Sequence, residues 1–193
     1  MPELGFHSIK ISACGKVVLN VGSTFSVKGD MQVTNGVLIL ESDFSSISLT
    51  IPKTHLSKIE IESGLSSVEC DGIDADVLSI NSSSGIKVSN SKVKTADMES
   101  ELGSIAVDSC EFKTAKLYAS SSVKAKIKDF NEIDINSEMS SVKFEYMKNE
   151  LVYVECESEI DSVHINGLFC GSKSCKHKLY VSCAGRIDLI SKD

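Results

Sequence analysis

Apolar and polar residues alternate along most of the chain, and the alternating stretches recur at a nearly constant spacing. Period-two alternation predicts half-buried β-strands, and the sequence lacks a window with the 3.6-residue period of an amphipathic helix. Fixed self-similarity on a scale of 18 or 19 residues is typical of stacked coils. The apolar positions that recur at this spacing, called the anchors below, are Ile61, Ile80, Met98, Leu117, Ile135 and Val154.

Each repeat has the same internal plan. An apolar-x-apolar pair such as Leu78 and Ile80 is followed by a small residue two positions later, then a turn, then a second pair such as Ile86 and Val88. A shorter third stretch leads back to the next repeat. The pattern predicts an all-β fold, a three-sided parallel β-solenoid (β-helix) of about 18–19 residues per coil with capping strands at both ends. The small residues are Ser63, Ser82, Ser100, Ala119, Ser137 and Cys156.

These small residues predict the corners of the coil. The backbone bends there and the interior is narrowest, so a small side chain fits best. A serine hydroxyl at a corner can also form a hydrogen bond with neighbouring backbone, which accounts for the abundance of serine in the chain.

The two ends of the chain follow a less regular plan. We expect a single β-solenoid domain over 1–193, with capping or irregular coils at 1–55, regular coils at 56–165, and an insert and closing coil at 166–193. Asn35-Gly36 between alternating stretches predicts a β-hairpin. Atypical ends are expected because a terminal coil must shield the core from water.

Several segments in order resemble a known family. They are GVLI (36–39) leading to ISLTIP (47–52), then SKIEIESG (57–64), LSINSSSGIKV (78–88) and LYVSCAGRIDL (179–189). In this order they are similar to the putative adhesin family, a bacterial domain of unknown function built as a β-solenoid. The resemblance covers roughly 6–189. It implies a repetitive β fold, no known enzymatic activity and a cell-surface location, and it brings no functional residues with it.

Charge and cysteine content narrow the classes of partner and compartment. The net charge of −7 argues against a nucleic-acid partner. We expect no transmembrane segment, because no apolar run approaches the roughly 18–20 residues of a membrane helix. The first residues lack the pattern of a signal peptide, and seven cysteines is an odd number. Both observations favour an intracellular location, with the cell surface as the alternative implied by the family.

One cluster of residues could hold a metal. Cys170, Cys175, His177 and Cys183 offer soft thiolates and an imidazole, the ligands that Zn²⁺ prefers. Their spacing lacks the C-x2-C pairs of common zinc sites, so we predict no metal, cofactor or catalytic site and keep these four as the candidates. Alternatives are a Cys170–Cys175 disulfide or redox pair, and ordinary loop and core thiols. Cys183 also falls on a small corner position.

No catalytic constellation stands out. The acidic residues alternate with apolar ones, as an outward face should, and no serine lies in a G-x-S-x-G elbow. The expected function is a non-enzymatic scaffold or adhesin-like interaction module that presents flat solenoid faces to a protein or polysaccharide. The alternatives are a carbohydrate-active β-helix enzyme, which needs paired carboxylates in a cleft, and a self-assembling structural protein, a homo-oligomer through the solenoid ends.

Overall fold

The computed structural model describes residues 5–160, 162–168 and 170–191, and over these residues the chain is all-β, which confirms the expected class. None of the described residues belongs to a helix that could cross a membrane. The strands are β1 (Ser8–Ala13), β2 (Val17–Gly22), β3 (Ser26–Lys28), β4 (Asp30–Thr34), β5 (Val37–Ser42), β6 (Ile47–Pro52), β7 (His55–Ser63), β8 (Val68–Asp71), β9 (Asp74–Ser82), β10 (Ile86–Ser89), β11 (Lys92–Ser100), β12 (Ile105–Ala119), β13 (Val123–Asp129), β14 (Glu132–Ser137), β15 (Val142–Tyr146), β16 (Val152–Ser158), β17 (Val163–Asn166), β18 (His177–Cys183) and β19 (Ile187–Ser191).

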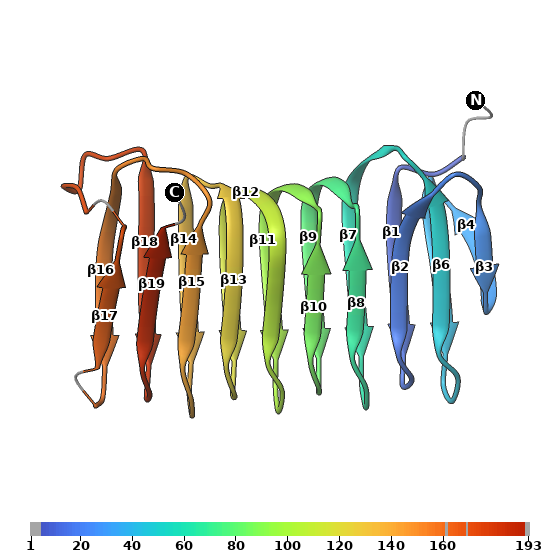
Figure 1. Cartoon of the computed structure of the whole chain (residues 1–193). Helices are drawn as coiled ribbons and strands as arrows, with labels where there is room; N and C mark the ends of the chain where they lie inside the picture. The colour runs from blue at the N-terminus through green and yellow to red at the C-terminus, as the bar shows by residue number, and fades with distance from the viewer. Residues whose placement is uncertain (1–4, 161, 169, 192–193) are drawn as a thin grey trace.

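The strands form a β-solenoid in which each coil lies on the next (Figure 1). One broad face consists of β5, β1, β7, β9, β11, the second half of β12, β14, β18 and β16, all paired in parallel. The other consists of β6, β2, β8, β10, the first half of β12, β13, β15, β19 and β17, also in parallel. Because the pairing is parallel and in register, each residue lies next to the residue at the equivalent position of the neighbouring coil.

The predicted anchors stack in one column through the regular coils. Ile61 pairs with Ile80, Ile80 with Met98, and the column continues through Leu117 to Ile135. These side chains are at most 1% exposed. Each fully buried aliphatic side chain contributes about 1.5–3 kcal/mol relative to an exposed one, so the column is a main source of stability.

The prediction that Val154 is the last anchor is wrong. Cys156 pairs with Val181, which pairs with Ile135, so Cys156 holds the anchor position and Val154 lies one inward position earlier. Ser158 rather than Cys156 then takes the corner position, next to Cys183. The spacing of the anchors changes here because β16 does not stack directly on β14, and β18 lies between them.

Both ends of the solenoid depart from sequence order. The first strand pair, β1 and β2, lies one coil inside the end, between β5 and β6 on one side and β7 and β8 on the other (Figure 1). At the opposite end, the last pair, β18 and β19, lies between β14 and β15 on one side and β16 and β17 on the other. Each end of the described chain is therefore hydrogen-bonded along both edges of its strands.

The hairpin predicted at Asn35-Gly36 is confirmed. It joins β4 to β5 in antiparallel pairing, and both residues have positive φ, 51° and 75°. A two-residue turn of this kind requires positive φ at both positions, which asparagine and glycine tolerate best. Together with β3, which pairs antiparallel with β6, β4 covers the outer edge of the first coil.

The predicted corner hydrogen bonds are also confirmed. Ser82 Oγ donates to the carbonyl of Ser66 at 2.6 Å, and Ser63 Oγ donates to the same carbonyl at 3.0 Å. Ser100 and Ser137 repeat the contact with turn carbonyls of preceding coils. All four serines are at most 3% exposed. The hydroxyls therefore satisfy buried backbone acceptors where the chain turns and strand pairing stops.

Replacing Ser82 with alanine should lower the free energy of unfolding by about 1 kcal/mol, because the turn loses one hydrogen bond while its packing is kept. Ala119 occupies the equivalent corner of another coil and is fully buried, so an alanine side chain fits at a corner position. Urea unfolding of Ser82→Ala measures the change, with Ser79→Ala on the outward side of the same strand as the matched control. Equal losses in the two variants would contradict a role for the corner hydroxyl.

Candidate functional site

The outward side chains of the first broad face form rows across the whole solenoid. In register with Ser8, Lys10 and Ser12 of β1, these rows carry nine carboxylates but only four lysines. We call this surface the acidic face. Its charged residues are Lys10, Glu41, Lys58, Glu60, Glu62, Asp97, Glu99, Lys116, Glu132, Asp134, Glu155, Glu157 and Lys178.

The opposite broad face is nearly neutral. In register with Val18 and Asn20 of β2, its rows carry five carboxylates and four lysines, and we call it the balanced face. Most of the excess negative charge of the chain therefore lies on one side. The charged residues of the balanced face are Glu69, Asp71, Lys87, Asp108, Lys124, Lys126, Lys143, Glu145 and Asp188.

A groove runs along the edge where the chain passes from one coil to the next. This edge groove has a volume of about 440 Å³ and spans several coils. Its floor contains Ala75, Val93 and Phe112, which are in register and at most 3% exposed. Its rim is charged on both sides.

The rim charges of the edge groove compensate one another. The ring nitrogens of His55 lie 2.7 Å from Asp74 Oδ1 and 3.0 Å from Asp76 Oδ1, and Lys94 Nζ lies 2.6 Å from Asp76 Oδ1. The hydrogen bond with Asp74 raises the pKa of His55, and the hydrogen bond with Lys94 lowers the pKa of Asp76. Asp74 is 19 residues after His55, one coil length, so the repeat itself could have predicted this contact.

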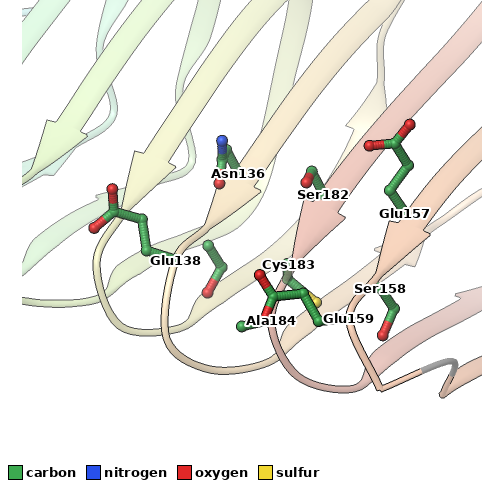
Figure 2. Close-up of a pocket in the computed structure, with 9 residues that line it drawn as sticks. Asn136, Glu138, Glu157, Ser158, Glu159, Ser182, Cys183 and Ala184 are labelled. Carbon is green, nitrogen blue, oxygen red and sulfur yellow. The ribbon is translucent and has the colours of Figure 1, made fainter.

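A second recess lies at the corner turns of the last coils (Figure 2). It has a volume of about 510 Å³ and is lined by small or polar residues together with Glu138, Glu157 and Glu159. Figure 2 shows Glu157 on β16, Glu159 in the turn that follows it and Glu138 in the turn after β14, with their carboxylates pointing in different directions. They do not converge on a common centre as the ligands of one ion or the acid and base of one reaction would.

The four candidate metal ligands occupy different surroundings. Cys170 is exposed, Cys175 is half-buried, and Cys183 is buried at a corner, where its Sγ lies 3.1 Å from the carbonyl of Gly185. These three cysteines are free thiols. Across residues 5–160, 162–168 and 170–191, no three side chains of His, Cys, Asp or Glu are placed to hold a metal ion. The corner position predicted for Cys183 is confirmed by its pairing with Ser137.

The buried His177 belongs to a different cluster. It is 2% exposed, and its Nε2 lies 2.6 Å from Glu150 Oε2 while Nδ1 contacts the carbonyl of Phe130. The centroid of its ring lies 5.2 Å from the ring centroid of Phe130 and 5.6 Å from that of Tyr146. Sequence reasoning missed this cluster because Phe130, Tyr146 and Glu150 reach His177 only through the exchanged order of the final coils.

A comparison with models of known protein families identifies the family of this chain. A family model described as Toastrack DUF4097 matches residues 10–159, more than half of the chain. The chain belongs to this family. The Toastrack assignment confirms the resemblance to an adhesin-like domain of unknown function.

Other comparisons add little to the Toastrack assignment. A crystal structure of a putative cell adhesion protein from Clostridium sporogenes is similar to the chain with 13% identity and a TM-score of 0.37, over 97% of this chain and 94% of the other. A search of curated proteins gave no match.

Glu150→Gln should destabilise the protein at neutral pH, by up to about 1 kcal/mol because the carboxylate is half exposed. The hydrogen bond with His177 lowers the pKa of Glu150. A carboxylate with a lowered pKa stabilises the fold above its ordinary pKa, and this stabilisation is lost as the pH falls through the lowered value. Urea unfolding at neutral and acidic pH measures the difference, which should vanish in acid. Glu62→Gln on the exposed acidic face is the control, and a difference that persists in acid would contradict this reasoning.

Proposed function

We propose that this Toastrack chain is a non-enzymatic, adhesin-like interaction module that presents the broad faces of a three-sided parallel β-solenoid to a protein or polymer partner. The observation that carries the proposal is the acidic face, whose nine carboxylates and four lysines lie in continuous register across the strands from β5 to β16. A surface of this extent with a clear excess of negative charge favours an extended partner of opposite charge.

Breaks in strand register support the three-sided cross-section. In β7, β9 and β11 the first two residues pair with neighbouring coils, then Ser57, Asp76 and Lys94 interrupt the ladder, and the pairing resumes one residue later. An interruption at the same place in successive coils is consistent with a corner. The short segment before it, which carries the floor of the edge groove, then forms the third side.

The rigidity of a solenoid suits a binding role. Its outward rows are fixed by the backbone pairing of neighbouring coils, so little backbone ordering is needed when a partner binds. A partner that follows one face could contact equivalent positions in successive coils. Affinity would then grow with the number of coils that are contacted.

The electrostatics of the carboxyl groups support a non-enzymatic role. A general acid needs a raised pKa, as in glycosidases. Among the described residues, the carboxyl groups with clearly shifted pKa values are Asp76, Asp129 and Glu150, and all three are lowered. Partial burial acts to raise the pKa of Asp129, but Lys148 and Lys176 outweigh it. These carboxylates serve as partners of cations.

Self-assembly through the solenoid ends is a second candidate, favoured by the exposed apolar residues there. Met31 and Val33 on the capping strand β4 are 51% and 47% exposed, and Val163 and Ile165 on β17 at the opposite end are 39% and 48% exposed. The outer edge of β17 is also without a strand partner among the described residues. Unpaired edges of this kind can add a strand from another copy.

The test compares two faces of the same protein. A labelled chain is applied to protein and glycan arrays, and the affinity for each ligand found is measured again with two double variants. Glu62→Lys with Glu99→Lys on the acidic face should weaken binding by about tenfold or more, because both substitutions oppose the charge that the partner recognises. Glu69→Lys with Asp108→Lys on the balanced face is the matched control.

Equal weakening by both double variants would contradict recognition through the acidic face. Cleavage of an arrayed glycan by the unmodified chain would instead support the carbohydrate-active alternative.

A further inference from the structure

Two tyrosines lie side by side at the end of the acidic face. Tyr153 on β16 and Tyr180 on β18 have ring centroids 6.2 Å apart with an interplanar angle of 69°, an edge-to-face arrangement. Carboxylates flank Tyr180, because Asp134 and Glu155 are its register partners on its two sides, whereas the register partner of Tyr153 is Lys178. The hydroxyl of Tyr153 donates to Glu155 Oε2 at 2.8 Å. We call Tyr153, Tyr180 and Glu155 the tyrosine cluster.

The chain places one of its own cations over this group. Lys173, from the segment between β17 and β18, holds its Nζ 5.6 Å from the centroid of the Tyr153 ring. This distance is within the range of a cation–π interaction. The Tyr153 hydroxyl, followed by the charge of Glu155, raises the pKa of Lys173, so its surroundings favour the charged ammonium.

We propose that the tyrosine cluster is a binding site for the ammonium or guanidinium group of a lysine- or arginine-rich segment of a partner protein, and that Lys173 occupies it as an internal stand-in when no partner is bound. The inference rests on the proposed interaction function and names the chemistry of the partner. Aromatic faces beside carboxylates are the combination that recognises a positively charged side chain.

The rest of the acidic face favours the same partner. Asp134 on β14 and Asp97 on β11 lie in the same row as Tyr180, with Lys116 of β12 between them, and these two carboxylates would attract further basic residues of an extended segment. Lys173 competes for the tyrosine cluster. The apparent affinity for an external cation is therefore reduced by the fraction of time that Lys173 fills the site.

The experiment uses an acetylated pentalysine amide as the probe and measures its affinity for the full chain by NMR titration. Lys173→Gln should tighten binding about two- to fivefold, the range that corresponds to an exposed cation–π contact. Lys176→Gln is the matched control. It removes the same charge from the same segment, but Lys176 lies 3.9 Å from Asp129 rather than over a tyrosine. The control should change the affinity by less than Lys173→Gln does.

Two further variants test the tyrosine cluster itself. Tyr153→Leu should weaken pentalysine binding by about two- to fivefold, whereas Tyr118→Leu, on another coil of the same face, should have a smaller effect. If Tyr153→Leu does not fold, Glu155→Gln provides the same test with the shape retained. Equal tightening by Lys173→Gln and Lys176→Gln would overturn the inference, since it would reflect net charge alone. So would an absence of pentalysine binding in all variants, although the array experiment could still find another partner for the module.

Discussion

The structure depends on the in-register parallel stacking of like residues from coil to coil. An isolated coil would leave its inward residues exposed, and it would leave the backbone groups on both strand edges unpaired. Stacking places Ile80 between Ile61 and Met98, and the same pairing buries the inward side chains and satisfies the backbone groups of each coil. The corner serines complete the arrangement, because their hydroxyls reach turn carbonyls where strand pairing stops. Shape is thus fixed by repetition, and the outward residues are free to vary in charge.

The features that recur in every coil could be predicted from the sequence, whereas those that depend on the strand order at the ends of the solenoid could not. The spacing of Ile61 to Ile135, the corner serines and the Asn35-Gly36 turn follow from local pattern, and all three are confirmed. The position of Val154 was wrong, because the last strand pair inserts before β16 and breaks the repeat. Such an exchange leaves no periodic signal in the sequence, since any strand with period-two alternation fits any coil. The surroundings of His177 and the tyrosine cluster depend on the same exchange and were missed for the same reason.

The distribution of charge gives the two broad faces different properties. Neighbouring charges along the edge groove, such as His55 with Asp74 and Lys94 with Asp76, are paired within the chain. The acidic face instead carries a surplus of carboxylates, and at its end Lys173 already lies over Tyr153. Cation recognition on this face would use a surface that the solenoid holds rigid. The lysine of the connecting segment would regulate access by competition.

The most direct test of the stacking order is a set of backbone NOE contacts recorded on isotopically labelled protein. The structure predicts that Tyr180 on β18 shows contacts to both Asp134 on β14 and Glu155 on β16, and that Ser12 on β1 shows contacts to both Glu41 on β5 and Glu62 on β7. Direct contacts between β14 and β16, with β18 neighbouring only one strand, would contradict the exchanged order of the coils and with it the geometry of the tyrosine cluster.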